Sequence, residues 1–181
     1  RPPDSPWELL LYAPMSAAPA GYYAAWMSAG IDPSAENAYR EILLKLFDHA
    51  NDLIGRERFS YEDHNDLDRF IQQVTEVLGD VLITLAKLIG HCDASNSSIY
   101  GDDDELKDSF ERQNLVQWVS LYSRDLRQVF ASRGQWGSEK LVRSLGAHME
   151  RHLWRYFLFP WVMDDGRVWI EVPKMGDHRF G

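Results

Sequence analysis

The segment LDRFIQQVTEVLGDVLITLAKLIG, residues 67–90, decides the fold. Its apolar residues recur every three or four positions, which is the spacing of one wide face of an α-helix. We therefore predict a long amphipathic helix over residues 61–90, opened by a capping box of Ser60 and Asp63. Gly79 in its interior costs about 1 kcal/mol relative to alanine. We expect another backbone or a large side chain to approach the helix at this glycine.

A second amphipathic helix is predicted over residues 103–131, after a polar and acidic loop at residues 91–102. The two helices would form a hairpin that hides only part of each apolar face. The remaining apolar surface must meet either other helices of the same chain or the same hairpin of a second copy.

The segments on either side of this hairpin are shorter. In residues 1–30 we expect no long regular element, because Pro14, Pro19 and Gly21 interrupt it. A helix should begin after Asp32, with a proline at its first position, and end at Gly55. The lead at residues 1–30 is thus set apart from a helical assembly domain at residues 31–181.

The C-terminal part of that domain is predicted to hold one more helix and an arm. The helix should begin at Ser138 and end before Pro160. A turn is expected at residues 164–166 and an extended segment at residues 167–172. The predicted fold class is all-α, with a long helical hairpin at residues 61–131, flanking helices, and a last helix and extended arm at residues 138–181.

Composition excludes several classes of function. The net charge is −9 and no basic run occurs, so phosphate contacts by this segment are disfavoured. The single cysteine, Cys92, cannot form a disulfide within the chain. Residues 9–31 carry no charge, but their prolines and glycine are unsuited to a spanning helix, and we predict no membrane partner.

No catalytic or metal-binding pattern stands out. His148 and His152 lie four residues apart on a predicted helix, but the glutamate of a zinc-protease motif and a third ligand are missing. His91 and Cys92 are adjacent, and neighbouring side chains rarely point at each other as a nucleophile and its base must. We therefore expect neither an enzyme nor a bound cofactor.

Several short segments run in a recognisable order along the chain. They are Ile31-Asp32-Pro33, Asp48 with Ala50 and Leu53, Gly79-Asp80, residues 84–90, residues 137–145, and Val168-Trp169-Ile170 with Pro173. In this order they resemble the capsid (core) proteins of hepadnaviruses and their non-enveloped fish-virus relatives. This family forms paired helical hairpins that project as spikes from a shell. The Arg-rich tail with which the family packages nucleic acid is absent from these 181 residues.

The resemblance implies a capsid protein that dimerises through a four-helix bundle and then assembles into an icosahedral shell. Its partner would be itself, and nucleic acid would bind only through a basic tail. It would reside in the virion capsid and, during assembly, in the host cytoplasm or nucleus. The implied dimer interface is Phe70, Val74, Val77, Val81, Leu85, Phe110, Val119 and Tyr122. The implied contacts between dimers are Trp161, Val168, Trp169, Ile170 and Pro173.

An alternative interpretation comes from two tryptophan-containing segments. Gln135-Trp136-Gly137 and residues 161–169 faintly resemble two motifs of Bcl-2 family proteins, and residues 75–80 resemble a third. This interpretation implies an all-α regulator that binds an amphipathic helix in an apolar groove. It requires a monomer, whereas the capsid interpretation requires self-association.

Overall fold

The computed structural model describes residues 6–101, 105–132, 139–165 and 167–173. Within these residues, six α-helices are followed by one antiparallel β-hairpin, which confirms the all-α class. The helices are α1 (Pro6–Ser28), α2 (Ala35–His64), α3 (Leu67–Ser95), α4 (Glu105–Arg112), α5 (Val116–Ala131) and α6 (Glu139–Arg155). The strands are β1 (Phe159–Val162) and β2 (Val168–Glu171).

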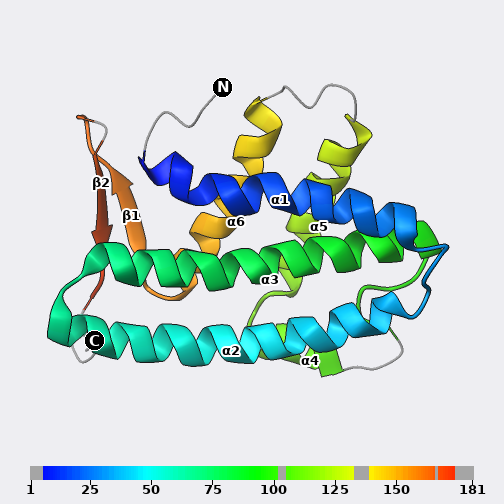
Figure 1. Ribbon diagram of the computed structural model, residues 1–181, viewed down its shortest axis with the longest axis horizontal. Helices are drawn as coiled ribbons and strands as arrows, with labels where there is room; N and C mark the ends of the chain where they lie inside the picture. Colours follow the sequence, from blue (N-terminus) through cyan, green and yellow to red (C-terminus); the bar gives the residue numbers. More distant parts are fainter. Residues whose placement is uncertain (1–5, 102–104, 133–138, 166, 174–181) are drawn as a thin grey trace.

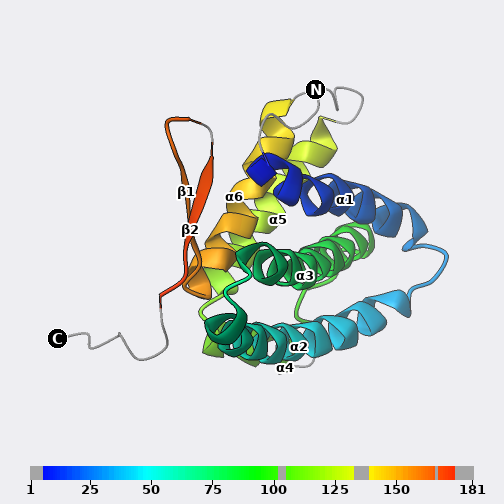
Figure 2. The same ribbon diagram turned by 60° about the vertical axis from the view of Figure 1, so that its left-hand side comes forward.

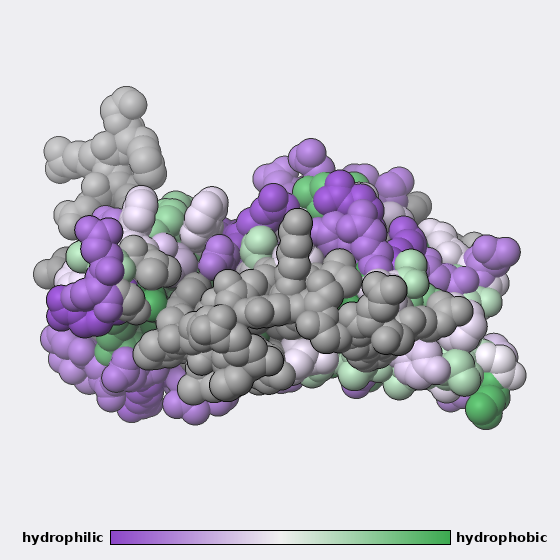
Figure 3. Space-filling view, turned by 90° about the horizontal axis from the view of Figure 1, so that it is seen from above, coloured by the Kyte–Doolittle hydropathy of each residue, from purple (hydrophilic) through white to green (hydrophobic). Residues whose placement is uncertain are grey.

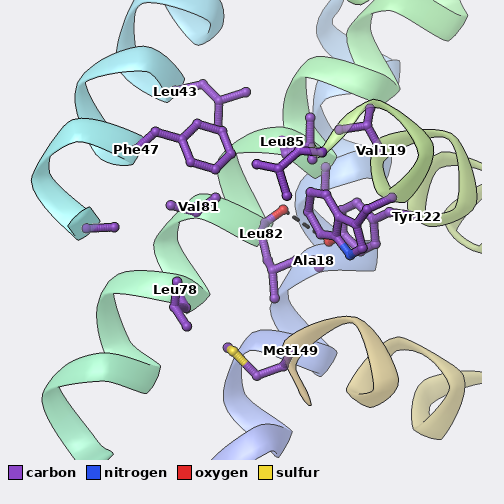
Figure 4. Packing of buried hydrophobic residues seen from close by; sticks show 14 of the residues in the cluster. Ala18, Leu43, Phe47, Leu78, Val81, Leu82, Leu85, Val119, Tyr122 and Met149 are labelled. Carbon is purple, nitrogen blue, oxygen red and sulfur yellow. Dashed lines mark hydrogen bonds between the residues drawn. The ribbon is translucent and has the colours of Figure 1, made fainter. Parts of the chain in front are cut away.

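Helix α3 forms the centre of the molecule. It runs between α1 and α2, and α5 and α6 pack across the remaining side (Figures 1 and 2). Phe70, Val74 and Leu85 of α3 are fully buried. In the same core, the Tyr122 hydroxyl of α5 donates a hydrogen bond to the carbonyl oxygen of Leu82 at 3.0 Å (Figure 4). Other helices of the chain therefore cover the wide apolar face predicted for residues 67–90.

The close approach predicted at Gly79 is confirmed, and α1 is the helix that approaches. A Cβ added at Gly79 would lie 3.2 Å from the Pro14 Cβ, and one added at Gly90 would lie 2.2 Å from the Tyr22 carbonyl oxygen. The expectation of no long regular element in residues 1–30 is therefore wrong. Pro14 and Pro19 both lie inside α1 and are buried, so packing against α3 outweighs the hydrogen bonds they remove.

Asparagines end the helices α2 and α3. Asn65 and Asn96 adopt left-handed conformations with φ of 55° and 59°, and each donates its backbone N–H to a carbonyl four residues earlier. The predicted stop at Gly55 and the capping box at Ser60 are wrong, because α2 continues through both. The side chain of Asp66 caps α3 instead, accepting a hydrogen bond from the Arg69 N–H at 3.1 Å.

The predicted hairpin of two long helices over residues 61–131 is also corrected. The second segment is broken at Asn114, where φ is 55°, so α4 and α5 point in different directions. Helix α4 packs against α2, and α5 packs against α3 and α6. The long antiparallel neighbours are α2 and α3, which places the chain reversal at residues 65–66 (Figure 1).

The last helix ends at Arg155, before the predicted stop at Pro160, because the chain turns at Phe157. Phe157 has a φ of 58°, and its N–H donates to the Trp154 carbonyl oxygen at 2.9 Å. The Leu158 N–H donates to the Leu153 carbonyl oxygen at 2.9 Å, which completes a Schellman motif. This turn directs the chain into β1, where Pro160 lies.

Candidate interaction surface

The eight residues expected at a dimer interface are all buried inside one chain. None exposes more than 6% of its surface, because α1, α2 and α6 cover the faces of α3 and α5. In this conformation they contact the chain's own helices, so they form its core. They are Phe70, Val74, Val77, Val81, Leu85, Phe110, Val119 and Tyr122.

Two of the five residues expected between dimers form an exposed pair on the β-hairpin. Trp161 of β1 lies directly opposite Trp169 of β2 in the strand register, so both side chains project from the same face. They are 58% and 63% exposed. Met163, two residues beyond Trp161, is also exposed. We call this outward face, with Trp161, Met163, Arg167, Trp169 and Glu171, the tryptophan face.

The opposite face of the hairpin packs against the helices. Val168 and Ile170 alternate with the exposed residues of β2, and both are half-buried against the core. Pro173 is half-buried at the end of the described arm. The structure thus separates the five residues: Trp161 and Trp169 are available to a partner, whereas Val168, Ile170 and Pro173 attach the hairpin to its own chain.

A buried arginine fixes the base of the hairpin. Arg58 of α2 donates hydrogen bonds to the carbonyl oxygens of Tyr156 at 2.8 Å and Pro173 at 2.6 Å. These two residues lie at the entrance to and exit from the hairpin, so one guanidinium holds both ends. Burial lowers the pKa of Arg58. The Tyr156 hydroxyl also donates to the Asn51 Oδ1 of α2 at 2.7 Å, which gives the hairpin a second attachment.

The tryptophan face carries one charge of each sign, with Arg167 directly before β2 and Glu171 at the end of β2. Arg167 and Glu171 are exposed and lie two residues before and after Trp169. Side chains two apart on a strand share a face, so the order along this face is cation, indole, anion. Asp165 in the turn accepts hydrogen bonds from the Arg167 backbone at 3.0 Å and the Arg167 Nε at 2.7 Å. Figure 2 shows the hairpin standing beside α6.

A second group of exposed apolar residues lies where α1 passes into α2. Tyr23, Met27 and Ile31 are exposed there, spaced about one helical turn apart. Figure 3 shows hydrophobic and weakly polar residues at this end of the molecule. In this stripe the Tyr23 ring packs against Phe130 of α5, with centroids 5.9 Å apart, so its aromatic contact is made within the chain.

The residues considered for chemistry are placed in the interior. Burial raises the pKa of the Cys92 thiol, whose sulfur donates to the Ser98 carbonyl oxygen at 3.6 Å. The adjacent His91 Nε2 lies 3.1 Å from the Asp32 carbonyl oxygen. His148 and His152 are both buried, and the described part of the chain holds no group of three or more potential metal ligands.

The Bcl-2-like interpretation requires an apolar groove that can hold a helix. A cavity of about 610 Å³ lies between the first turns of α2 and a wall formed by Ser97, Ser98, Tyr100, Gly101, Glu105 and Leu106. Glu36, Arg40, Glu41 and Glu105 line it, so an apolar helix would have to desolvate charged groups there. Gln135-Trp136-Gly137, the first of the motifs behind that interpretation, lies outside the described residues.

Compared with known protein families, curated proteins and solved structures, the chain matches none of them. Among the described residues, no helix combines the length and the apolar character that crossing a bilayer requires.

Two features of this surface were missed by sequence reasoning. Arg58 lies between the predicted helix stop at Gly55 and the predicted cap at Ser60. Because that stop was wrong, the sequence did not indicate that Arg58 is buried on a helix. Nothing in the sequence indicates that the helix turns at Phe157, because the left-handed position that ends a helix is normally occupied by glycine or asparagine. Alternation of small and large residues over 159–162 could have suggested β1.

Proposed function

We propose that this chain is a non-enzymatic structural protein that self-associates through the tryptophan face, as a subunit of a capsid-type shell. The exposed Trp161–Trp169 pair carries the proposal. Tryptophans are enriched at the energetic centres of protein interfaces, and two of them held in register on a short sheet form a rigid anchor. Trp169 also lies in one of the segments that resemble the hepadnavirus arm.

The charges on the tryptophan face favour a second copy as the partner. If two copies meet about a two-fold axis through Trp169, Arg167 of each copy faces Glu171 of the other. The face is therefore complementary to itself. The net charge of −9 opposes association elsewhere on the surface, which favours a small contact of this kind over a broad one.

The size of the tryptophan face sets the strength of the contact. Covering four tryptophans, each more than half exposed, removes roughly 500 Å² from water, worth roughly 12 kcal/mol at 25 cal/mol per Å². Association costs about 4–15 kcal/mol. A single contact is therefore weak, and a shell of many copies would be stabilised by the sum of many such contacts. Such a subunit belongs in the virion and in the host compartments where shells form.

This proposal places the contact away from the eight buried core residues. Pairing through those residues as a four-helix spike would require α1, α2 and α6 to leave α3 and α5. No contact with nucleic acid is proposed for residues 1–181, whose charge opposes it.

The test is self-association of the full chain, measured by sedimentation velocity and negative-stain electron microscopy. We expect the unaltered protein to form dimers or larger particles, and Trp161→Ala with Trp169→Ala to leave folded monomers. Met27→Ala is the matched control, an exposed apolar residue near the end of α1. Normal particles from the double tryptophan variant would refute the proposed contact.

Charge exchange tests the two-fold geometry. Arg167→Glu alone places four acidic groups at the contact, and Glu171→Arg alone places four basic groups there, so each variant should remain monomeric. Mixed together, the two variants restore both opposite-charge pairs and should associate. A mixture that remains monomeric while the unaltered chain associates would exclude the two-fold arrangement.

A further inference from the structure

A buried aromatic and histidine cluster joins α5 to α6. The Trp118 and Tyr122 rings of α5 stack with centroids 5.4 Å apart. The His152 ring of α6 meets Trp118 edge-on at 4.2 Å, and the His148 ring meets Tyr122 at 5.0 Å. Both histidines are 2% exposed. The cluster therefore forms most of the seam between these two helices.

This cluster is poor in hydrogen bonds for its polar content. Within the described part of the chain, neither ring nitrogen of His152 has a hydrogen-bond partner, nor do the Nδ1 of His148 and the indole N–H of Trp118. The His148 Nε2 lies 2.9 Å from Asp125 Oδ2, so this imidazole has a carboxylate partner on α5. A neutral imidazole tolerates such a site at modest cost, whereas an imidazolium without a partner does not.

We propose that the seam between α5 and α6 is an acid-sensitive latch, in which protonation of His148 and His152 releases α6 from α5.

The surrounding charges determine which histidine dominates. Burial lowers the pKa of both rings from 6.5, to about 3 for His152. Asp125 opposes the shift at His148, whereas Arg155 adds to it at His152, so His152 is the main sensor. The other titratable groups near the seam are Arg124 and Tyr122 on α5 and Arg151 on α6. On α3, Glu76 and Asp80 are exposed. Neither α1 beyond residue 8 nor β1 contains a charged residue.

The direction of the pH effect follows from these pKa values. Above pH 6.5, docked and released rings are both neutral, so pH does not affect docking. As the pH falls below 6.5, released rings bind protons that docked rings do not, and release gains up to about tenfold per pH unit for each ring. For His152 this gain continues down to about pH 3.

The test is hydrogen exchange of the full chain at pH 7.5, 6.5 and 5.5, corrected for intrinsic rates. We expect the opening of α6 to increase several-fold to tenfold between pH 6.5 and 5.5, while α3 stays protected. His152→Leu, which cannot take up a proton, should reduce this increase. His49→Leu, at an exposed position on α2, is the matched control and should leave it unchanged.

Three outcomes would overturn the latch. The first is that protection of the α6 amides does not change with pH. The second is that the α3 and α6 amides lose protection together, as in global unfolding. The third is that α6 of His152→Leu opens at low pH as much as α6 of the unaltered chain. If the variant does not fold, NMR titration of the histidine ring protons in the unaltered protein decides. Titration of His152 near its ordinary value of 6.5 in the native chain would refute the proposal.

Discussion

Replacing Arg58 with methionine should detach the β-hairpin from the helical body. Methionine keeps the length of the side chain but removes both hydrogen bonds, leaving the carbonyl oxygens of Tyr156 and Pro173 without this donor. Hydrogen bonds from a charged donor are worth about 1.5–3 kcal/mol each. Burying methionine also avoids the desolvation cost of burying the guanidinium. We therefore expect a net loss of about 2–4 kcal/mol in the free energy of unfolding.

The measurement combines urea denaturation with hydrogen exchange of the hairpin amides. One useful amide is the Met163 N–H, which donates to the Arg167 carbonyl oxygen at 2.8 Å. In Arg58→Met we expect this amide to exchange faster while α3 remains protected. Arg58→Lys should be intermediate, because one ammonium group cannot reproduce the two-pronged geometry of a guanidinium.

Arg56→Met supplies the matched control. Arg56 lies two residues earlier on α2 and is exposed, so its loss should change stability by less than about 0.5 kcal/mol. If Arg58→Met is as stable as Arg56→Met and its hairpin amides exchange at the normal rate, then Arg58 does not fix the hairpin. The account of how the tryptophan face is positioned would then be wrong.

Further predictions concern the α1–α3 contact and the turn after α6. Gly90→Ala should destabilise by about 2–4 kcal/mol in urea denaturation, because its Cβ would lie 2.2 Å from the Tyr22 carbonyl oxygen. Gly79→Ala should be nearly neutral, since its 3.2 Å contact with Pro14 is offset by helix propensity; equal effects would contradict this. Phe157→Gly should raise the unfolding midpoint by relieving about 1 kcal/mol of left-handed strain; a lower midpoint would show that the Phe157 ring packs more strongly than the turn is strained.

The sequence indicated the central helix because its apolar period is unbroken over more than twenty residues. The helix ends were misplaced because glycines were taken as stops, whereas Gly55 and Gly90 lie inside helices and Asn65, Asn96 and Asn114 take the left-handed positions. Asparagine tolerates that conformation through its short polar side chain. Nothing local distinguishes a glycine that ends a helix from one that admits a neighbouring helix, because the neighbour is distant in sequence.

The tryptophan face was partly anticipated. Trp169 was predicted to lie between dimers because its segment resembles a capsid arm, and Trp161 was predicted to join it there; the contact itself stays a prediction. Their pairing depends on β1, a segment that was predicted to end the last helix because Pro160 was expected to terminate it. The burial of the eight proposed interface residues within one chain could not be predicted, because the uncharged stretch at residues 9–31 was expected to be irregular and no helix was left to cover α3.

The order of the helices along the chain also affects how the protein is made. Helix α1 leaves the ribosome before the other described helices, but it packs on α3, α5 and α6, all of which are synthesised later. Leu11, Ala18 and Tyr22, which the finished protein buries, are therefore exposed while α2 and α3 are translated. At about 5–20 residues per second this interval lasts several seconds. A nascent-chain chaperone that binds uncharged apolar segments would have its target at residues 9–31 during that interval.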